Sequence, residues 1–91
     1  MNLNDLYALI LDRKINPKPG SYTNSLLDDG LPRMAQKVGE EGTEVVVAAL
    51  AQENSRLVEE IADLTFHTLV LMAARGLTPA DVLDELEKRH K

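Results

Sequence analysis

The residues best suited to chemistry are acidic side chains in two segments of the sequence. Glu40, Glu41 and Glu44 lie in the run KVGEEGTEVVVAAL, and Glu60 and Asp63 lie in EEIADLTFHTLVLM. Each group adjoins a strongly apolar run, where a charge is costly unless something such as a divalent cation compensates it. The acids of a solvated helix face, with weak ion pairs, are the ordinary alternative for any one of these residues. The joint pattern in two segments favours a shared site.

A helical projection places the first acids beside two bases. Residues of an α-helix advance by about 100° each around the axis. With Glu40 at zero, Glu44 falls at about 40° and Glu41 at about 100°. On the same scale Arg33 falls at about 20° and Lys37 at about 60°. Three acids and two bases therefore share one narrow polar stripe beside the edge of the core.

The second acidic segment forms a similar stripe. When Glu60 is at zero, Asp63 falls at about 300°, Arg56 at about 320° and His67 at about 340°. Apolar residues border this stripe, so we expect it to face another helix across a cleft. Two such stripes on adjacent helices would bring about four or five carboxylates together.

Such a cluster requires compensating positive charge. Carboxylates about 4 to 6 Å apart repel one another and raise each other's pKa unless cations neutralise them. Mg²⁺ binds oxygen ligands and keeps several waters, which leaves room for phosphate oxygens and an attacking water. Lys37 and Arg33 suit phosphate groups, Lys as a point charge and Arg as a fork. The two stripes therefore predict a metal and phosphate site.

His67 and two glycines are better interpreted structurally. His67 could bind a metal one turn after Asp63, but a lone His on a largely apolar helix is more often packed with a satisfied hydrogen bond, and we favour that interpretation. Gly39 and Gly42 each cost about 1 kcal/mol of helix propensity. We therefore expect a helix or loop to lie tight against them.

The elements that would position these residues are all helical. Apolar spacing predicts a first helix over about Asn4 to Lys14, with Asn2 or Asn4 as its cap. The segment Ile15 to Tyr22 contains two Pro and a Gly and is expected to be a loop. The further helices are expected from a Thr23 cap through Asp29, over Leu31 to about Gln52, and from an Asn54 or Ser55 cap to Arg75.

Glycines and a capping sequence mark the helix ends. Gly30 and Gly76 are expected to stop the helices before them. The sequence Thr78-Pro79-Ala80-Asp81 combines an N-cap Thr, Pro at the first helical position and an acid at the third. In this last helix, apolar side chains should face the core: Val82, Leu83 and Leu86.

Length indicates one domain spanning residues 1–91. The helical patterns predict an all-α fold, a helical hairpin with flanking helices, and we expect dimerisation to complete the helical bundle. Hydrophobic residues make up 44% and aromatic residues 3%, so the core should be aliphatic and could extend across a subunit interface.

The net charge of -5 and the lack of Trp disfavour a nucleic-acid partner. The longest uncharged run, Leu64 to Ala74, is too short to span a membrane. Cys is absent and no signal peptide is evident, so we expect a cytoplasmic protein.

Several motifs resemble the phosphoribosyl-ATP pyrophosphatase family of histidine biosynthesis, within the wider all-α nucleotide pyrophosphohydrolase (MazG-like) superfamily. The resemblance covers nearly the whole chain. The Glu-Glu-x-x-Glu and Glu-x-x-Asp patterns are typical of the superfamily, and Ser-Tyr-Thr with Lys-Val-Gly-Glu-Glu of this member. The matching stretches are Ser21-Tyr22-Thr23, Gln36-Lys37-Val38-Gly39-Glu40-Glu41, Glu44-Val45-Val46 and Glu59-Glu60-Ile61-Ala62-Asp63-Leu64.

The resemblance implies hydrolysis of 1-(5-phosphoribosyl)-ATP to the AMP compound and pyrophosphate, with Mg²⁺, or Mn²⁺ in its place, in a homodimer or higher homo-oligomer. The implied metal ligands are Glu41, Glu44, Glu60 and Asp63. Glu40 is implied either as a further ligand or as a base beside the metal, so that the implied catalytic residues are Glu40, Glu41 and Glu44.

The implied substrate contacts come from two segments. Arg33 and Lys37 would hold phosphate oxygens. Ser21, Tyr22 and Thr23 would contact the substrate from the loop, although turn and capping chemistry is an equal alternative for them.

Three other functions fit parts of the pattern. A housecleaning pyrophosphatase of the same superfamily would act on dUTP, dCTP or a damaged nucleotide. A non-catalytic helical dimerisation module would carry the acids only as surface. A di-iron carboxylate bundle normally uses Glu-x-x-His, whereas the spacing here ends in Asp63 and Glu44, which favours Mg²⁺ or Mn²⁺ over iron.

Overall fold

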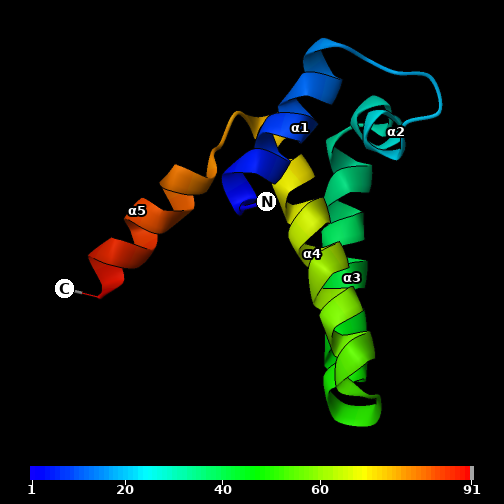
Figure 1. Ribbon diagram of the computed structural model, residues 1–91, viewed down its shortest axis with the longest axis vertical. Coiled ribbons are helices and arrows are strands. Elements are labelled where there is room, and N and C mark those ends of the chain that lie inside the picture. The colour runs from blue at the N-terminus through cyan, green and yellow to red at the C-terminus, as the bar shows by residue number, and fades with distance from the viewer. Residues whose placement is uncertain (91) are drawn as a thin grey trace.

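The computed structural model describes residues 1–90, and these residues form α-helices with no strand (Figure 1). The all-α prediction is confirmed. The helices of the described chain are α1 (Leu3–Ile15), α2 (Tyr22–Asp29), α3 (Leu31–Ala51), α4 (Asn54–Arg75) and α5 (Pro79–Arg89).

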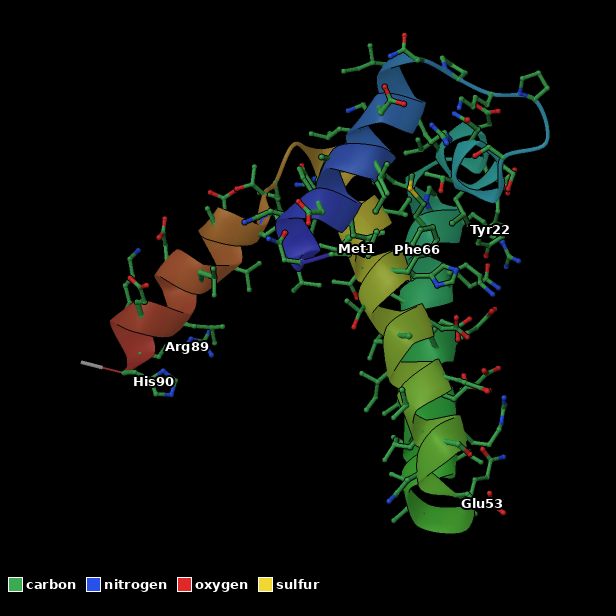
Figure 2. All side chains as sticks on the ribbon, viewed as in Figure 1. Met1, Tyr22, Glu53, Phe66, Arg89 and His90 are labelled. Carbon is green, nitrogen blue, oxygen red and sulfur yellow. The ribbon has the colours of Figure 1, made fainter. Side chains whose placement is uncertain are left out.

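The two longest helices, α3 and α4, form the predicted hairpin and lie side by side along its length (Figure 1). Glu53 lies at the turn between them (Figure 2) and is the N-cap of α4, so the predicted caps Asn54 and Ser55 are wrong. The side chain of Glu53 makes no capping hydrogen bond, and its backbone carbonyl accepts from the amides of Arg56 and Leu57 instead. No helix within residues 1–90 is long and apolar enough to cross a membrane.

Helix α2 begins two residues earlier than a Thr23 cap would allow. Ser21 is its N-cap, and Ser21 Oγ accepts a hydrogen bond from the amide of Asn24 at 3.2 Å, so Thr23 lies inside the helix. Gly30 ends α2 as predicted, and its backbone φ of 93° is one that residues other than Gly rarely adopt. Asn2 is the cap of α1, one of the two candidates.

The hydrophobic core joins the first four helices. Tyr7 is the only aromatic residue of the buried cluster within residues 1–90, and its hydroxyl donates to the carbonyl of Leu77. The rest of the buried cluster is non-aromatic, as the composition predicts: Ile10, Leu26, Met34, Leu69, Val70, Met72 and Ala73.

Helix α5 is the part of the fold that differs most from expectation. Thr78 and Asp81 form the predicted capping box, but α5 has no buried residue and extends away from the hairpin (Figure 1). Its apolar side chains are exposed, so the prediction that they face the core is wrong. Together with residues of α1 and α4, they line an open apolar groove of about 460 Å³. The exposed side chains of α5 in this groove are Val82, Leu83 and Leu86.

The two glycines of α3 also differ from expectation. No heavy atom outside the helix backbone lies within 4 Å of a Cβ added at Gly39 or Gly42. The predicted helix or loop tight against them is therefore wrong for a single chain.

Candidate metal and phosphate site

The hairpin brings acids from both predicted stripes together. One carboxylate oxygen from each of Glu41, Glu60 and Asp63 lies within 4.8 Å of the others. Glu41, on α3, is 6% exposed, and Glu60, on α4, is 5% exposed, whereas Asp63 is exposed. The cluster therefore consists of two buried glutamates and one exposed acid, Asp63.

Each buried glutamate has the same pairing. Lys37 Nζ lies 3.3 Å from Glu41 Oε1, and Arg56 Nη2 lies 2.7 Å from Glu60 Oε1, each base one helical turn before its acid. The second oxygens, Glu41 Oε2 and Glu60 Oε2, are buried without any hydrogen-bond partner in the described structure. An unpaired buried carboxylate oxygen is costly. The three carboxylates could therefore hold a metal ion, and their all-oxygen donor set suits a hard cation.

Glu44 lies beside this cluster but outside its closest group. It is exposed, and the nearby Glu44 carboxyl is the largest cause that raises the pKa of Glu60. Burial and the charge of Asp63 raise this pKa further, and Arg56 partly opposes them. In the absence of a cation, Glu60 therefore holds its proton more tightly than an ordinary glutamate does.

Glu40 is placed differently from the other acids. Its Oε1 accepts a hydrogen bond from Gln36 Nε2 at 2.7 Å and lies 3.8 Å from Arg33 Nη1. The hydrogen bond from Gln36 is the largest cause that lowers the pKa of Glu40, and Lys37 and Arg33 lower it further, while slight burial opposes them. The structure therefore places Glu40 on the outer side of Lys37 and not in the three-carboxylate group.

Lys37 lies between Glu40 and the three-carboxylate cluster, and it contacts acids of both. Its Nζ lies 3.6 Å from Glu40 Oε2 as well as 3.3 Å from Glu41, and its side chain is 18% exposed. Burial lowers the pKa of Lys37, but the contact with Glu41 and the neighbouring side chains of Tyr22 and Glu40 outweigh it and raise the pKa. Lys37 therefore keeps its charge beside the cluster, whereas Arg33 is more exposed and contacts Glu40 alone among the described acids.

The predicted loop contacts have separate positions. Ser21 is committed to capping α2, and Thr23 is half-buried within that helix. Tyr22 is exposed, and its hydroxyl lies 2.8 Å from Nε2 of His67. His67 is buried, and its Nδ1 lies 2.7 Å from the carbonyl oxygen of Asp63, so the prediction of a packed His with satisfied hydrogen bonds is confirmed.

Two pairings were not assigned from the sequence. Arg56 was placed on the second stripe, but its role as the partner of Glu60 was not inferred, although their spacing of four residues is a usable signal. The contact between Tyr22 and His67 joins residues 45 positions apart and leaves no local signal.

Comparison with known proteins gives consistent matches. A family model described as phosphoribosyl-ATP pyrophosphohydrolase matches residues 3–90. A protein from Sulfurisphaera tokodaii named phosphoribosyl-ATP pyrophosphatase is 53% identical, over 98% of this chain and 95% of its own length. One of the same name from Saccharolobus solfataricus is 48% identical over the same shares. A histidine biosynthesis bifunctional protein from Caldanaerobacter subterraneus subsp. tengcongensis is 46% identical over 98% of this chain and 43% of its own length.

Proposed function

Because the chain belongs to the phosphoribosyl-ATP pyrophosphohydrolase family, we propose that it hydrolyses 1-(5-phosphoribosyl)-ATP to 1-(5-phosphoribosyl)-AMP and pyrophosphate, the second step of histidine biosynthesis. The site of this reaction is the carboxylate cluster of α3 and α4. The observation that carries this assignment is that Glu41 Oε2 and Glu60 Oε2 are both buried and unpartnered. The neighbouring bases contact only the Oε1 atom of each glutamate.

The metal we propose for this cluster is Mg²⁺, with Mn²⁺ as an alternative. The residues that would hold it are Glu41, Glu60 and Asp63, with Glu44 as a fourth carboxylate beside Glu60. When bound, Mg²⁺ supplies positive charge to phosphate oxygens and makes water more acidic.

The basic residues bind the phosphates in this proposal. The Lys37 ammonium, which stays charged and lies at the edge of the cluster, holds a phosphate oxygen as a point charge. The more exposed Arg33 guanidinium holds the outer phosphate. Glu40 positions both bases, because its carboxylate lies within 4.0 Å of each and its lowered pKa keeps it charged.

A water attacks phosphorus, the bond to the departing phosphate oxygen breaks, and the proton of the water passes to a carboxylate. Glu44 is the acceptor of that proton in this proposal, since it is exposed and its carboxyl lies near enough to Glu60 to affect the pKa of that residue. Glu40 is a weaker base because its pKa is lowered. Glu44 then acts as the general base and Glu41 as a ligand, which divides the roles of the implied catalytic residues.

We further propose that a second copy of the chain covers the apolar surface that α5 and the hairpin leave open. Val46, Val58 and Ile61 are exposed on the hairpin. From Ile61, Thr65 and Thr68 continue along α4 at helical spacing into the apolar groove beside α5. Exposed apolar side chains beside an open apolar groove are typical of a subunit interface, and a second hairpin would complete a helical bundle.

A pyrophosphate-release assay tests the function. We expect purified protein with Mg²⁺ to release pyrophosphate from phosphoribosyl-ATP faster than from ATP, dUTP or dCTP, and to lose this activity with a chelator. Faster release from dUTP or dCTP would point to a housecleaning enzyme. No release from any of these substrates in well-folded protein with Mg²⁺ would overturn the proposal.

A further inference from the structure

The contact between Tyr22 and His67 fixes where each hydrogen lies. Nδ1 of His67 is 2.7 Å from the carbonyl oxygen of Asp63, and a carbonyl can only accept, so Nδ1 carries the hydrogen. In the neutral ring Nε2 then has a free lone pair, and the Tyr22 hydroxyl, 2.8 Å away, donates to it. The phenol is therefore held through its hydrogen, and its oxygen lone pairs remain available.

Two rings fix the plane of Tyr22. Its ring centroid lies 6.2 Å from that of Phe66 at an interplanar angle of 26°, and 5.7 Å from that of His67 at 78°. Tyr22 and Phe66 lie next to each other at the α2 end of the hairpin (Figure 2). One face of the Tyr22 ring is thus covered, and yet the residue is 52% exposed.

Tyr22 lies near two features that fit different parts of a nucleotide. Lys37 lies near enough for Tyr22 to contribute to its raised pKa, and Asp63 of the cluster lies one turn before His67, the partner of Tyr22. Tyr22 also lines an open hollow of about 670 Å³ with the loop from Pro17 and the start of α2. A triphosphate at the cluster would place the attached nucleoside in the region of Tyr22.

The composition leaves Tyr22 as the main surface for stacking. The chain has two Tyr, one Phe and no Trp. Tyr7 is 7% exposed in the core, and Phe66 is half-buried behind Tyr22. Aromatic faces are the usual platform for purine and pyrimidine bases, because every base has a π-face.

We propose that His67 is a positioning residue, which holds the phenol of Tyr22 through Nε2 so that the exposed face of the Tyr22 ring stacks on the purine of the substrate. This inference rests on the proposed function for the identity of the substrate, and it assigns recognition of the base to a pair of residues outside the carboxylates. Phe66 supports the opposite face of the ring.

The kinetics of matched variants with phosphoribosyl-ATP test the pair. Tyr22→Phe keeps the ring and loses the hydroxyl, and His67→Leu keeps the bulk and loses the acceptor. Each should raise KM by about 3- to 10-fold, the effect of one hydrogen bond, with kcat within about twofold. The double variant should be no worse than either single one, because both remove the same hydrogen bond. Tyr22→Leu, which removes the ring, should raise KM by about 10-fold or more.

Rescue separates positioning from packing. The side-chain oxygen of Gln can accept from the phenol, so His67→Gln should recover most of the KM that His67→Leu loses. The proposal fails if His67→Gln behaves as His67→Leu does, if the two single effects multiply in the double variant, or if Tyr22→Leu leaves KM unchanged. Melting temperature and its increase with Mg²⁺ show that each variant is folded with its cluster intact.

Tyrosine fluorescence tests the inference even if the proposed function fails. Without Trp, emission comes from Tyr7 and Tyr22, and Tyr7 is buried. With Mg²⁺ present, ATP should quench the emission of the wild-type protein but not that of Tyr22→Leu, and inorganic tripolyphosphate should quench neither. Quenching with no turnover of phosphoribosyl-ATP would overturn the substrate and keep the stacking role. Turnover of phosphoribosyl-ATP with equal effects of ATP and tripolyphosphate on emission would overturn the stacking role and keep the substrate.

Discussion

One carboxylate oxygen of Glu41 lies within 4.8 Å of one from Glu60, although the two residues belong to different helices. Both are buried, and both leave their second oxygen unpartnered. Lys37 and Arg56 compensate only one oxygen of each pair. The metal-free hairpin therefore contains mutual repulsion, which a cation would relieve.

Glu41→Gln and Glu60→Gln should abolish most activity and yet stabilise the metal-free protein. Each keeps the shape of the side chain and removes one of the repelling charges. Because even indirect partners of metal ligands contribute about 10- to 100-fold, we expect losses of about 100-fold or more in pyrophosphate release. Thermal melting with a chelator should show a higher midpoint than wild type, and added Mg²⁺ should raise it less.

Glu87→Gln is the matched control for these variants, since Glu87 is an exposed acid on α5. It should leave activity and the Mg²⁺ response unchanged. Equal losses in the control, or lower metal-free stability together with full activity in the cluster variants, would contradict a metal site.

Lys37→Met should weaken substrate binding more than Arg33→Met. Lys37 contacts both Glu40 and Glu41 and is mostly buried, whereas Arg33 is more exposed. The loss of one charge-assisted hydrogen bond corresponds to about a 10-fold or larger rise in KM for Lys37→Met. Steady-state kinetics at several salt concentrations would check this, and the effect of Arg33→Met should shrink more as salt is added. The opposite order of KM values would contradict the assignment of Lys37 to the inner phosphate.

Stability should depend on pH through Glu60. The pKa of Glu60 is raised above its usual value of 4.5, first by the neighbouring Glu44 carboxyl and then by burial. The folded metal-free protein therefore binds this proton more tightly than the unfolded chain does. Its contribution to stability is fully present below pH 4.5 and is lost as pH rises through the raised pKa. The increase in melting temperature caused by Mg²⁺ should grow over the same rise, because the ion needs the charged carboxylate.

Comparison with Glu60→Gln isolates this effect from other carboxylates. The lowered pKa of Glu40 acts in the opposite direction, giving stability above pH 4.5 that is lost as pH falls. The difference in melting temperature between wild type and Glu60→Gln with a chelator should therefore turn against wild type as pH rises. A difference that does not change with pH would contradict the raised pKa of Glu60.

Local signals in the sequence predicted most of the fold. Apolar spacing, Gly30, Gly76 and the Thr78 capping box gave the helices to within a few residues. The predicted N-caps of α2 and α4 were wrong because several polar residues are adjacent at both helix starts. The backbone conformation decides which of them is the cap, and the residue types alone do not determine that conformation. The family of the chain was also predicted correctly from its motifs.

Long-range relationships could be predicted only in part. The projection onto helices indicated that about four or five acids of the two stripes would meet, and three of them do: Glu41, Glu60 and Asp63. The same projection placed Glu40 on the stripe but could not show that Gln36 holds it outward. An apolar stripe on α5 showed only that its side chains need cover, and it could not tell whether the same chain supplies that cover.

Ile61→Glu should dissociate the proposed dimer. Ile61 is exposed in the middle of the apolar surface that runs along α4 into the groove beside α5. A glutamate there would bury an unpaired charge against the second copy, which should weaken association by about 10-fold or more. Light scattering coupled to size-exclusion chromatography should give at least a dimer mass for wild type and a mass that falls towards the monomer for Ile61→Glu.

Ile15→Glu is the control for this substitution. Ile15 is at least as exposed and equally apolar, but it lies at the end of α1, away from the groove and from the exposed face of the hairpin. It should leave the mass unchanged. A wild-type protein that is monomeric at all concentrations would remove the second copy as the cover of this surface. Equal dissociation by Ile15→Glu would instead locate the interface on α1, because one apolar side chain can be critical for association only where the partner contacts it.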